Sequence, residues 1–419
     1  MDLLALAVPF FLLALVIEIV VGRIRGTAYF RTNDAINSLS AGTLSTTIGY
    51  FSRFIPAGIS AYVLRDYSIL DIDAASFSLS PTGILHWLVA LIAFDFCYYW
   101  AHRYGHEISI LWASHAVHHQ SEDYNLSTAL RQTSSGFLFT WVFYLPLFLL
   151  GMPFEVFVTV NALDLIYQFW VHTQHIRRLG WMEKVFVTPS NHRVHHAQNE
   201  IYIDRNYGGI LIIWDRLFGT FQDELESEPV VFGVRKPLRS WNPFWANLQV
   251  YDYLLFDSLR TRKWRDKIGV WFRRTGWRPA DMVAKYPKQK ADPAAFEKFD
   301  PEVSPGVRRY VLAQFLVAVL MVLLIGQVYA TQGLEAVIIP CVLLWALLLS
   351  LGRLNEGRNS APKFELFRLL AITPIGLYGL LQGAGSSWDT ATTWISVAVY
   401  LGLSMVMLRP AWQVELIPE

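Results

Sequence analysis

The chain has 419 residues, of which 53% are hydrophobic and only 16% are charged. Charged residues make up about 25% of a typical soluble protein, so this composition excludes an ordinary soluble domain and favours a membrane protein. The net charge of +1 argues against a nucleic-acid partner, and the two cysteines, Cys97 and Cys341, lie too far apart for a CxxC metal site and indicate no disulfide framework.

The first predicted membrane span is an apolar run over residues 2–22, which after Asp2 is interrupted only by Glu18. About 20 apolar residues cross the hydrocarbon core of a bilayer. The run lacks the basic start and the small-residue cleavage site of a signal peptide, so we expect it to remain as a span. Three arginines follow directly and predict a cytoplasmic loop: Arg23, Arg25 and Arg31.

A second apolar stretch covers roughly residues 36–64 and contains Arg53 and Pro56. It is consistent with one bent span, or with a span followed by a segment at the membrane surface, and the residues do not choose between these. The next loop, 65–82, has one arginine and three aspartates. This charge balance is typical of the outer side of a membrane.

The third span is predicted over residues 83–101, and a polar stripe leads from it into the first histidines. Four polar residues recur at steps of three or four and therefore share one helical face: Asp95, Tyr99, His102 and His106. An ionisable residue inside a membrane usually faces a protein interior and serves function. Asp95 is therefore a candidate catalytic-site residue that supports a histidine, and buried packing is the alternative.

Two histidine-rich segments carry the strongest signal in the chain. HRYGHEISILWASHAVHH at 102–119 holds five of the eleven histidines, and NHRVHH at 191–196 holds three more. Residues three and four apart lie on the same side of a helix, so each HxxxH or HxxHH pattern presents its imidazoles together. We predict a metal site formed by eight histidines: His102, His106, His115, His118, His119, His192, His195 and His196.

Residues 136–172 are predicted to form two helices that bend at the Gly-Met-Pro sequence of residues 151–153. The return helix carries a second polar stripe with helical spacing: Asn161, Asp164, Gln168 and His172. We expect His172 to be a ninth metal ligand because it ends this stripe level with the other histidines. His175 lies nearly a full turn further out and His86 is isolated in an apolar segment, so both are less favoured as ligands.

Between residues 173 and 309 lie 23 of the 35 lysines and arginines, which predicts a large cytoplasmic segment. Within it, four large apolar residues fall on one helical face among six basic residues: Trp264, Ile268, Trp271 and Phe272. A basic helix with an aromatic face suits the headgroup region of a membrane. A solvated helix that packs on its own domain is the alternative.

Four further spans are predicted near residues 310–330, 334–352, 364–382 and 392–408. The short basic loops fall on the side that carries the histidines, so the site is predicted to be cytoplasmic. The expected fold is an all-α, multi-pass bundle of about eight or nine spans with a helical, histidine-rich cap. We expect four segments: N-terminal spans at 1–82, a catalytic region at 83–230, a basic amphipathic connector at 231–308, and C-terminal spans at 309–419.

The number of histidines bears on which metal they bind. Four-coordinate zinc would be saturated by half of the eight, so eight or more nitrogen donors suit two adjacent metals. Imidazole accepts zinc, copper, iron and nickel, and the spacing does not choose among them. A pair of irons that activates dioxygen is the best chemical match to a membrane setting, because C–H oxidation suits lipid substrates.

The histidine patterns HxxxH, HxxHH and HxxHH resemble those of the fatty acid hydroxylase/sterol desaturase superfamily. The flanking words are more specific: HHQSEDYNLSTALRQ at 118–132, FWVHTQH at 169–175 and NHRVHHAQNEIYIDRNYGGILIIWDRLFGTF at 191–221. These words resemble the alkylglycerol monooxygenase branch, which acts on ether lipids. The similarity covers roughly residues 20–225, and the added C-terminal spans also fit that branch.

The resemblance implies a di-iron centre held by the eight histidines and joined by His172, with oxygen and tetrahydropterin, or another external reductant, as co-substrates. Glu107 matches a family acid that is important for activity. Asn206 and Tyr207 match family words and are candidate cofactor-binding residues; Tyr124, Asn125 and Asp204 match family words without a role that we can derive. No glycine-rich nucleotide loop is present, so no NAD or FAD site is expected.

The implied reaction is hydroxylation of a lipid C–H bond, on the ether-linked carbon of an alkylglycerol. A fatty acyl or sterol hydroxylase or desaturase is the first alternative, since the same histidines would serve it. A metal-binding transporter or sensor is a second, although transport predicts polar residues spread over several spans and repeated halves. The expected partners are the bilayer, a lipid substrate and an electron donor, and the sequence leaves the lipid, the reductant and the oligomeric state open.

Overall fold

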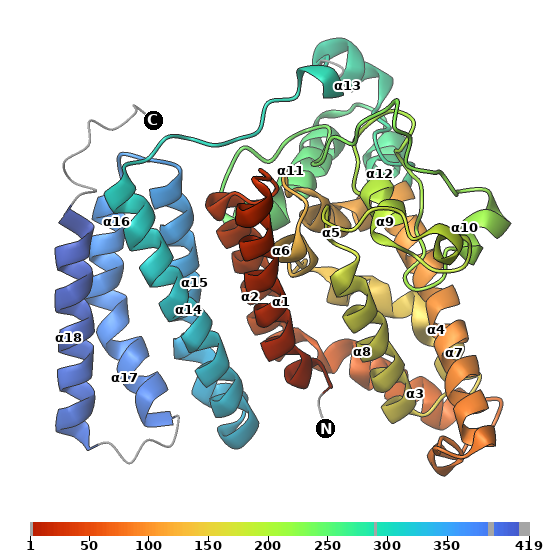
Figure 1. The fold of residues 1–419 in the computed structure, drawn as a ribbon, viewed down its shortest axis with the longest axis horizontal. Helices are drawn as coiled ribbons and strands as arrows, with labels where there is room; N and C mark the ends of the chain where they lie inside the picture. The colour runs from red at the N-terminus through yellow and green to blue at the C-terminus, as the bar shows by residue number, and fades with distance from the viewer. Residues whose placement is uncertain (1–2, 289–290, 384–388, 410–419) are drawn as a thin grey trace. The chain divides into compact units, whose positions relative to one another are not determined.

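The structure is a computed structural model that describes residues 3–288, 291–383 and 389–409. All of its regular elements in these ranges are helices (Figure 1), with only isolated β-bridges between segments. The all-α prediction is therefore confirmed. The bounds in the first half are α1 (Leu3–Arg25), α2 (Thr32–Ser52), α3 (Phe54–Tyr67), α4 (Pro81–Glu107), α5 (Ser109–His119), α6 (Leu126–Ala129), α7 (Leu145–Leu149), α8 (Phe154–Trp170), α9 (Pro189–His195) and α10 (Ile213–Phe218).

The second half of the chain begins with amphipathic helices and ends with long apolar ones. Its bounds are α11 (Pro243–Arg260), α12 (Trp264–Phe272), α13 (Ala280–Lys285), α14 (Pro305–Gln332), α15 (Leu334–Asn355), α16 (Ala361–Phe367), α17 (Thr373–Gly383) and α18 (Thr390–Leu408). A π-helical turn, Arg368–Ile372, joins α16 to α17 without a break. Short 3₁₀ turns occupy Ala74–Ser76, Gly136–Leu138, Thr140–Tyr144, Gly180–Lys184 and Pro293–Ala295.

Six helices among the described residues are long and apolar enough to cross a membrane, so the chain is a multi-pass membrane protein. They are Leu6–Arg25, Pro81–Glu107, Pro305–Gln332, Leu334–Asn355, Ala361–Gly383 and Thr390–Leu408. The stretch 36–64 is not among them and divides at Arg53 into α2 and α3. The larger predicted number of spans stays a prediction.

The first arm of the predicted 136–172 hairpin is not a full helix. It consists of two 3₁₀ turns and the five-residue α7, and only the return arm, α8, is a continuous helix. Pro146 lies in the first turn of α7. Because proline has no N–H to continue a preceding helix, it marks a new start. The predicted bend is where expected, since α8 begins directly after Pro153.

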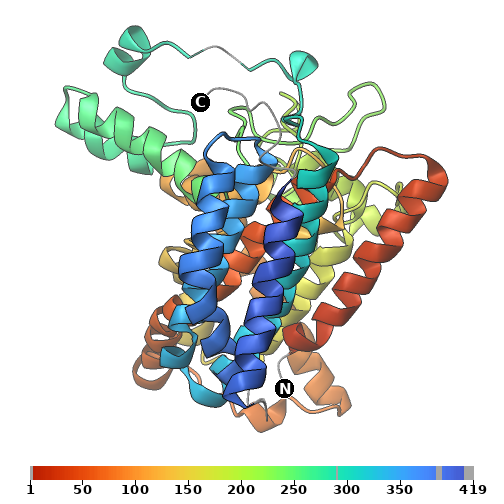
Figure 2. The ribbon, with the colours of Figure 1, turned by 90° about the vertical axis from the view of Figure 1, so that its left-hand side faces the viewer.

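The chain divides into two compact units. The second contains Thr32–Phe51, Arg239–Ala246 and Lys298–Glu419, so α2 belongs with the C-terminal helices. Ile36 and Leu44 of α2 are buried in one cluster with apolar residues of α14 and α15. Figure 2 shows α14 to α18, in teal to blue, running side by side within this unit. The predicted boundaries at 82, 230 and 308 stay predictions, and these contacts group the segments differently.

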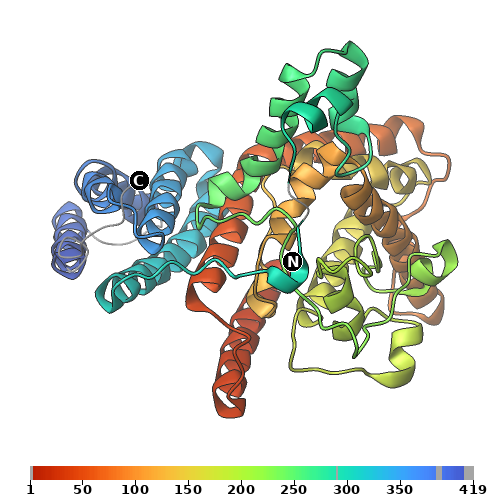
Figure 3. The same cartoon turned by 90° about the horizontal axis from the view of Figure 1, so that it is seen from above.

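The first unit contains Met1–Arg31, Ser52–Leu238 and Asn247–Glu297, and it carries all the histidines. In it, α5 and α9 lie at one end of α4 and α8, among the loops that follow α8 (Figures 1 and 3). One extended residue, Ile108, separates α4 from α5. This tight connection turns the histidines of α5 back onto those at the end of α4.

Candidate metal centre

Nine histidines form two adjacent groups, and they are the nine that the sequence singled out. The five-histidine group contains His102, His106, His115, His119 and His195; the four-histidine group contains His118, His172, His192 and His196. Within each group, the nearest donor atoms all lie within 4.8 Å of one another. His86 and His175 lie outside both groups: His86 Nδ1 is 3.0 Å from the carbonyl oxygen of Ser76, and the His175 ring packs against Tyr29.

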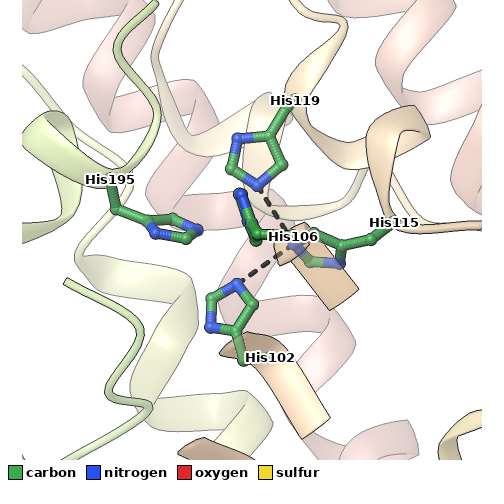
Figure 4. A group of neighbouring side chains, drawn as sticks. All are labelled: His102, His106, His115, His119 and His195. Carbon is green, nitrogen blue, oxygen red and sulfur yellow. Dashed lines mark hydrogen bonds between the residues drawn. The ribbon is translucent and has the colours of Figure 1, made fainter. Parts of the chain in front are cut away.

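The five-histidine group combines three helices around His115 (Figure 4). His115 Nε2 of α5 lies 3.0 Å from both His102 Nε2 of α4 and His119 Nε2 of α5. His106 and His195 complete the group, and their Nε2 atoms are buried without a hydrogen-bond partner. Buried polar atoms in folded proteins are normally paired. The unpaired Nε2 atoms of His106 and His195 are therefore available to bind a metal ion.

The four-histidine group is arranged around His192 in the same way. His192 Nε2 of α9 lies 3.0 Å from His172 Nε2 and 3.2 Å from His196 Nε2. His118, from the last turn of α5, has its Nε2 3.2 Å from His172 Nε2. Two nitrogens bound to one metal at about 2.1 Å and at right angles lie about 3 Å apart, which matches these separations.

The hydrogen bonds of the Nδ1 atoms determine which ring nitrogen of each histidine carries the proton. The Nδ1 atoms of His118 and His172 lie 2.9 and 2.7 Å from the carbonyl oxygens of Arg131 and Gln168. A carbonyl can only accept, so each neutral ring carries its proton on Nδ1 and directs a lone pair from Nε2. The Nε2 atoms of His118 and His172 therefore face each other as two acceptors, an arrangement that a cation between them would stabilise.

The same pattern orients two histidines of the other group. The Nδ1 atoms of His102 and His195 lie 2.8 and 3.0 Å from the carbonyl oxygens of Tyr207 and Arg205. Metal-binding histidines commonly donate their second N–H to a carbonyl or carboxylate, which fixes the tautomer. Both groups thus fit a pair of bound metal ions by donor type, spacing and orientation.

Burial keeps these imidazoles neutral. It lowers the pKa of His118 to about 4, and it holds the pKa of His119, His192 and His195 well below the ordinary value. A charged imidazole cannot bind a metal, so a lowered pKa preserves the ligand form at neutral pH.

One loop supplies both carbonyls that orient the five-histidine group, and its backbone is strained. Asp204 and Asn206, on either side of Arg205, have positive φ angles of 57° and 56°. Residues other than glycine rarely adopt this left-handed conformation. Such outliers persist where the surroundings enforce them, often at functional sites.

The Asp215 carboxylate holds the loop around Tyr207 in place through hydrogen bonds. It accepts hydrogen bonds from the backbone N–H groups of Tyr207, at 2.7 Å, and Gly208, at 2.8 Å, and from the Thr220 hydroxyl at 2.7 Å. Asp215 is completely buried. Sequence reasoning missed this residue because its signal, one acid in the word that resembles the family, does not reveal which backbone groups it meets.

Asp95 has a different setting from the predicted one. Its carboxylate accepts from the backbone N–H groups of Ile210 and Leu211 and from Trp214 Nε1, at 2.7, 3.1 and 2.8 Å, so it holds the histidine-orienting loop and hydrogen-bonds no histidine directly. Gly209 passes between two aspartates: an added Cβ would lie 2.9 Å from Asp95 Oδ1 and 2.7 Å from Asp164 Oδ1. Only glycine allows this close approach.

The two predicted cofactor-binding residues have separate surroundings. The Asn206 side chain donates to the carbonyl oxygens of Asn191 and Gln222 and accepts from the Gln222 N–H, so its amide is committed to holding α9 and the loop together. Contact of Asn206 with a cofactor stays a prediction. The Tyr207 ring instead lies 5.4 Å, centre to centre, from His106, and its hydroxyl is buried without a hydrogen-bond partner.

Glu107 pairs with an arginine of its own helix. Its carboxylate forms an ion pair with Arg103 one turn earlier, at 3.0 Å. Arg103 also donates to the Tyr99 hydroxyl at 3.2 Å. Consecutive residues on a helix are about 100° apart, which explains why Glu107 does not share the direction of its neighbour His106.

The four-histidine group is supported by the first helix. Glu18, the charge within the α1 span, accepts from the Leu126 N–H at 2.7 Å and from the Thr173 hydroxyl at 2.6 Å, directly beside His172. Tyr124 donates to the Val171 carbonyl oxygen at 2.9 Å, and its ring stacks on His172. Glu18 was visible as an isolated charge in a span, but its target was not.

Comparison with known proteins agrees with this geometry. The family model "Fatty acid hydroxylase" matches residues 87–220. An alkylglycerol monooxygenase of Danio rerio is 35% identical over 383 residues, covering 90% of this chain and 82% of that protein. One of Homo sapiens is 36% identical over 396 residues, covering 92% and 85%. An ornithine lipid hydroxylase of Rhizobium tropici is 34% identical over 137 residues, covering 32% of this chain and 41% of that protein.

No solved structure matches the chain. The family match spans the histidine-bearing helices, and the full-length relatives extend the similarity over the C-terminal helices as well. Together with the membrane helices and the paired histidine groups, these matches confirm the predicted resemblance and indicate iron-dependent oxygenase chemistry. The chain therefore belongs to the alkylglycerol monooxygenase family and is a membrane lipid monooxygenase.

Proposed function

We propose that the two histidine groups bind two iron ions and that the enzyme hydroxylates the ether-linked carbon of alkylglycerols. The observation that carries the metal assignment is the facing pair of Nε2 acceptors on His118 and His172, whose Nδ1 protons are committed to carbonyl oxygens. The substrate assignment is supported by the relatives named alkylglycerol monooxygenase, which this chain matches over most of its length.

When bound, the iron pair would supply the activation of dioxygen. One oxygen atom enters the C–H bond next to the ether oxygen, and the other leaves as water after two electrons and two protons are added. A tetrahydropterin, or another external reductant, would supply those electrons. The ether oxygen weakens the adjacent C–H bond because it donates electron density to the electron-poor carbon. The product is a hemiacetal, which collapses to a fatty aldehyde and glycerol.

The protein's own contribution is position and exclusion of water. The loop that contains Tyr207 fixes the direction of two ligands, and Asp95 and Asp215 fix that loop. We assign Asp95 a positioning role. Because the Tyr207 ring lies against His106 of the five-histidine group, we place Tyr207 beside the site at which oxygen and the lipid would react. Glu107 would act through its ion pair with Arg103. An alkyl tail gains about 0.8 kcal/mol for each methylene that is buried, so long-chain substrates should bind better than short ones.

We also propose that the histidine groups lie on the cytoplasmic side. The basic residues at the C-terminal end of α1 and those in and around the turn from α15 to α16 support this orientation through the positive-inside rule: Arg23, Arg25, Arg353, Arg358 and Lys363. A reporter inserted at residues 291–300 should be protected from reagents added outside the cell. External labelling at this site would overturn the orientation.

The reaction is tested with purified protein, ferrous iron, oxygen, a tetrahydropterin and a long-chain alkylglycerol. We expect fatty aldehyde release that His119→Ala abolishes and that His175→Ala, which removes a histidine outside both groups, leaves intact. Hydroxylated acyl chains or sterols with the ether untouched would instead establish the alternative substrate class. Tightly bound zinc without iron or oxygen consumption would refute the di-iron assignment.

A further inference from the structure

The helix α12 exposes an apolar face. Trp264, Ile268 and Phe272 follow one another at four-residue steps and are 78%, 62% and 64% exposed. Leu259, near the end of α11, is 67% exposed. Trp271, which the sequence placed on the same face, turns inward and donates from Nε1 to the Ser258 hydroxyl at 3.2 Å. The exposed apolar face of α12 is therefore narrower than predicted: it contains Trp264, Ile268 and Phe272 but not Trp271.

Basic side chains surround this face. Residues 260–274 contain seven lysines and arginines and one acid, Asp266, which gives a formal charge of +6. Six of the seven basic residues are exposed: Arg260, Arg262, Lys263, Arg265, Arg273 and Arg274. An apolar stripe with Trp and Phe inside a basic rim is the pattern of a helix that lies at an anionic membrane surface.

The position of α12 in the first unit suits such a surface. The residues after it are hydrogen-bonded to the turn between α4 and α5: Ser109 N–H donates to the Arg273 carbonyl oxygen, and Thr275 N–H donates to the Glu107 carbonyl oxygen, both at 3.0 Å. The Thr275 hydroxyl donates to the His106 carbonyl oxygen. Since α4 is a candidate membrane span, its end marks the level of the bilayer surface.

We propose that α12 and the end of α11 form a membrane-surface anchor, which inserts Leu259, Trp264, Ile268 and Phe272 among the headgroups of an anionic leaflet. A second copy of the chain fits this surface less well, because symmetric pairing would bring two strongly basic rims together. The proposal goes beyond the reaction: it assigns a lipid-binding surface that is tied through three hydrogen bonds to the backbone of a histidine-bearing turn, and so fixes the depth of the site in the membrane.

The test measures contact with lipid directly. In a background in which Cys97 and Cys341 are replaced by alanine, Ile268→Cys is labelled with a fluorophore, and the protein is placed in bilayers with spin-labelled lipids. Glu200→Cys serves as the matched control, because Glu200 is exposed in the same unit and lies in a polar setting. In phosphatidylglycerol-containing bilayers, we expect the label at residue 268 to be quenched severalfold more than the label at residue 200.

Charge reversal provides the second arm. Combining Arg262→Glu, Lys263→Glu and Arg265→Glu should reduce quenching at residue 268 severalfold, as should bilayers made only of phosphatidylcholine. Equal, weak quenching at residues 268 and 200 in anionic bilayers would overturn the anchor. Efficient cross-linking between two residue-268 thiols, with quenching absent, would assign the face to a second copy instead. Neither readout depends on the substrate, so the anchor and the proposed reaction can fail separately.

Discussion

The two histidine groups draw on shared helices but rest on different parts of the chain. Helix α5 gives His115 and His119 to one group and His118 to the other, and α9 likewise divides its histidines. The five-histidine group is oriented by the loop around Tyr207, whereas the four-histidine group is supported by Glu18 of α1 and by Tyr124. Because α5 and α9 contribute to both groups, the distance between the two groups is fixed. Because different residues support each group, a substitution can change the orientation of the histidines in one group and leave the other unchanged.

The difference in ligand number also separates the groups. For two metals of the same coordination number, the four-histidine group leaves one more position open than the five-histidine group. We expect this group to offer more room for oxygen or water. The comparison therefore predicts two distinct metal environments rather than one repeated site.

The largest effect should come from removing the central histidine of either group. His115→Ala and His192→Ala each delete a nitrogen that approaches two other histidine nitrogens. Each should lower activity by more than the roughly 10–100-fold typical of losing an outer partner, and should keep part of the iron because the other group is intact. Elemental analysis and single-turnover assays measure both. Wild-type activity in either variant would show that the histidine group it belongs to is not needed for the reaction.

A smaller effect is expected from the supports. Asp215→Asn should weaken iron binding in the five-histidine group, and Glu18→Gln should act on the four-histidine group, each by roughly 10–100-fold. Mössbauer spectra of ⁵⁷Fe-loaded protein should show a different iron site altered in each variant. Glu200→Gln is the surface control. The same spectral change in both variants would contradict separate support.

The strained loop gives a test specific to the five-histidine group. Asp204 has a φ of 57°, which glycine adopts freely and a β-branched residue resists. Asp204→Gly should be close to neutral, while Asp204→Val should lower the free energy of unfolding by about 1–2 kcal/mol. Thermal unfolding in detergent, together with the iron content, measures this. Equal behaviour of the two variants would mean that the loop is not strained.

The response of the metal-free protein to pH provides a separate test of the buried histidines. The pKa of His118 is lowered to about 4 by burial, whereas an unfolded histidine has a pKa of about 6.5. Between these values the unfolded chain binds more protons, so the free energy of unfolding should fall as the pH is lowered from about 6.5 to 4. Bound iron should oppose this loss. A metal-free protein with constant stability across this window would contradict the buried, neutral state.

Much of the histidine centre could be predicted from the sequence, because it depends on the spacing of residues within single helices. Helical spacing predicts that His102 meets His106 and that His192 meets His196, and the polar stripe on α8 correctly brought His172 to the same place. The apolar runs likewise predicted most of the membrane helices. These features depend on residues a few positions apart, whose relation is set by the helix itself.

The division into two groups required the tertiary structure. His118 and His119 are neighbours in sequence but point about 100° apart on a helix, and only the packing of α4, α8 and α9 around α5 decides which group each one joins. The same holds for Glu18 reaching Thr173 and for α2 joining the C-terminal helices. The hydrogen-bond partners of the Asn206 amide, Asn191 and Gln222, were likewise not visible in the sequence, because they lie 15 and 16 residues away. Sequence periodicity reports the direction of a side chain from its own helix, whereas its partner is decided by contacts between distant segments.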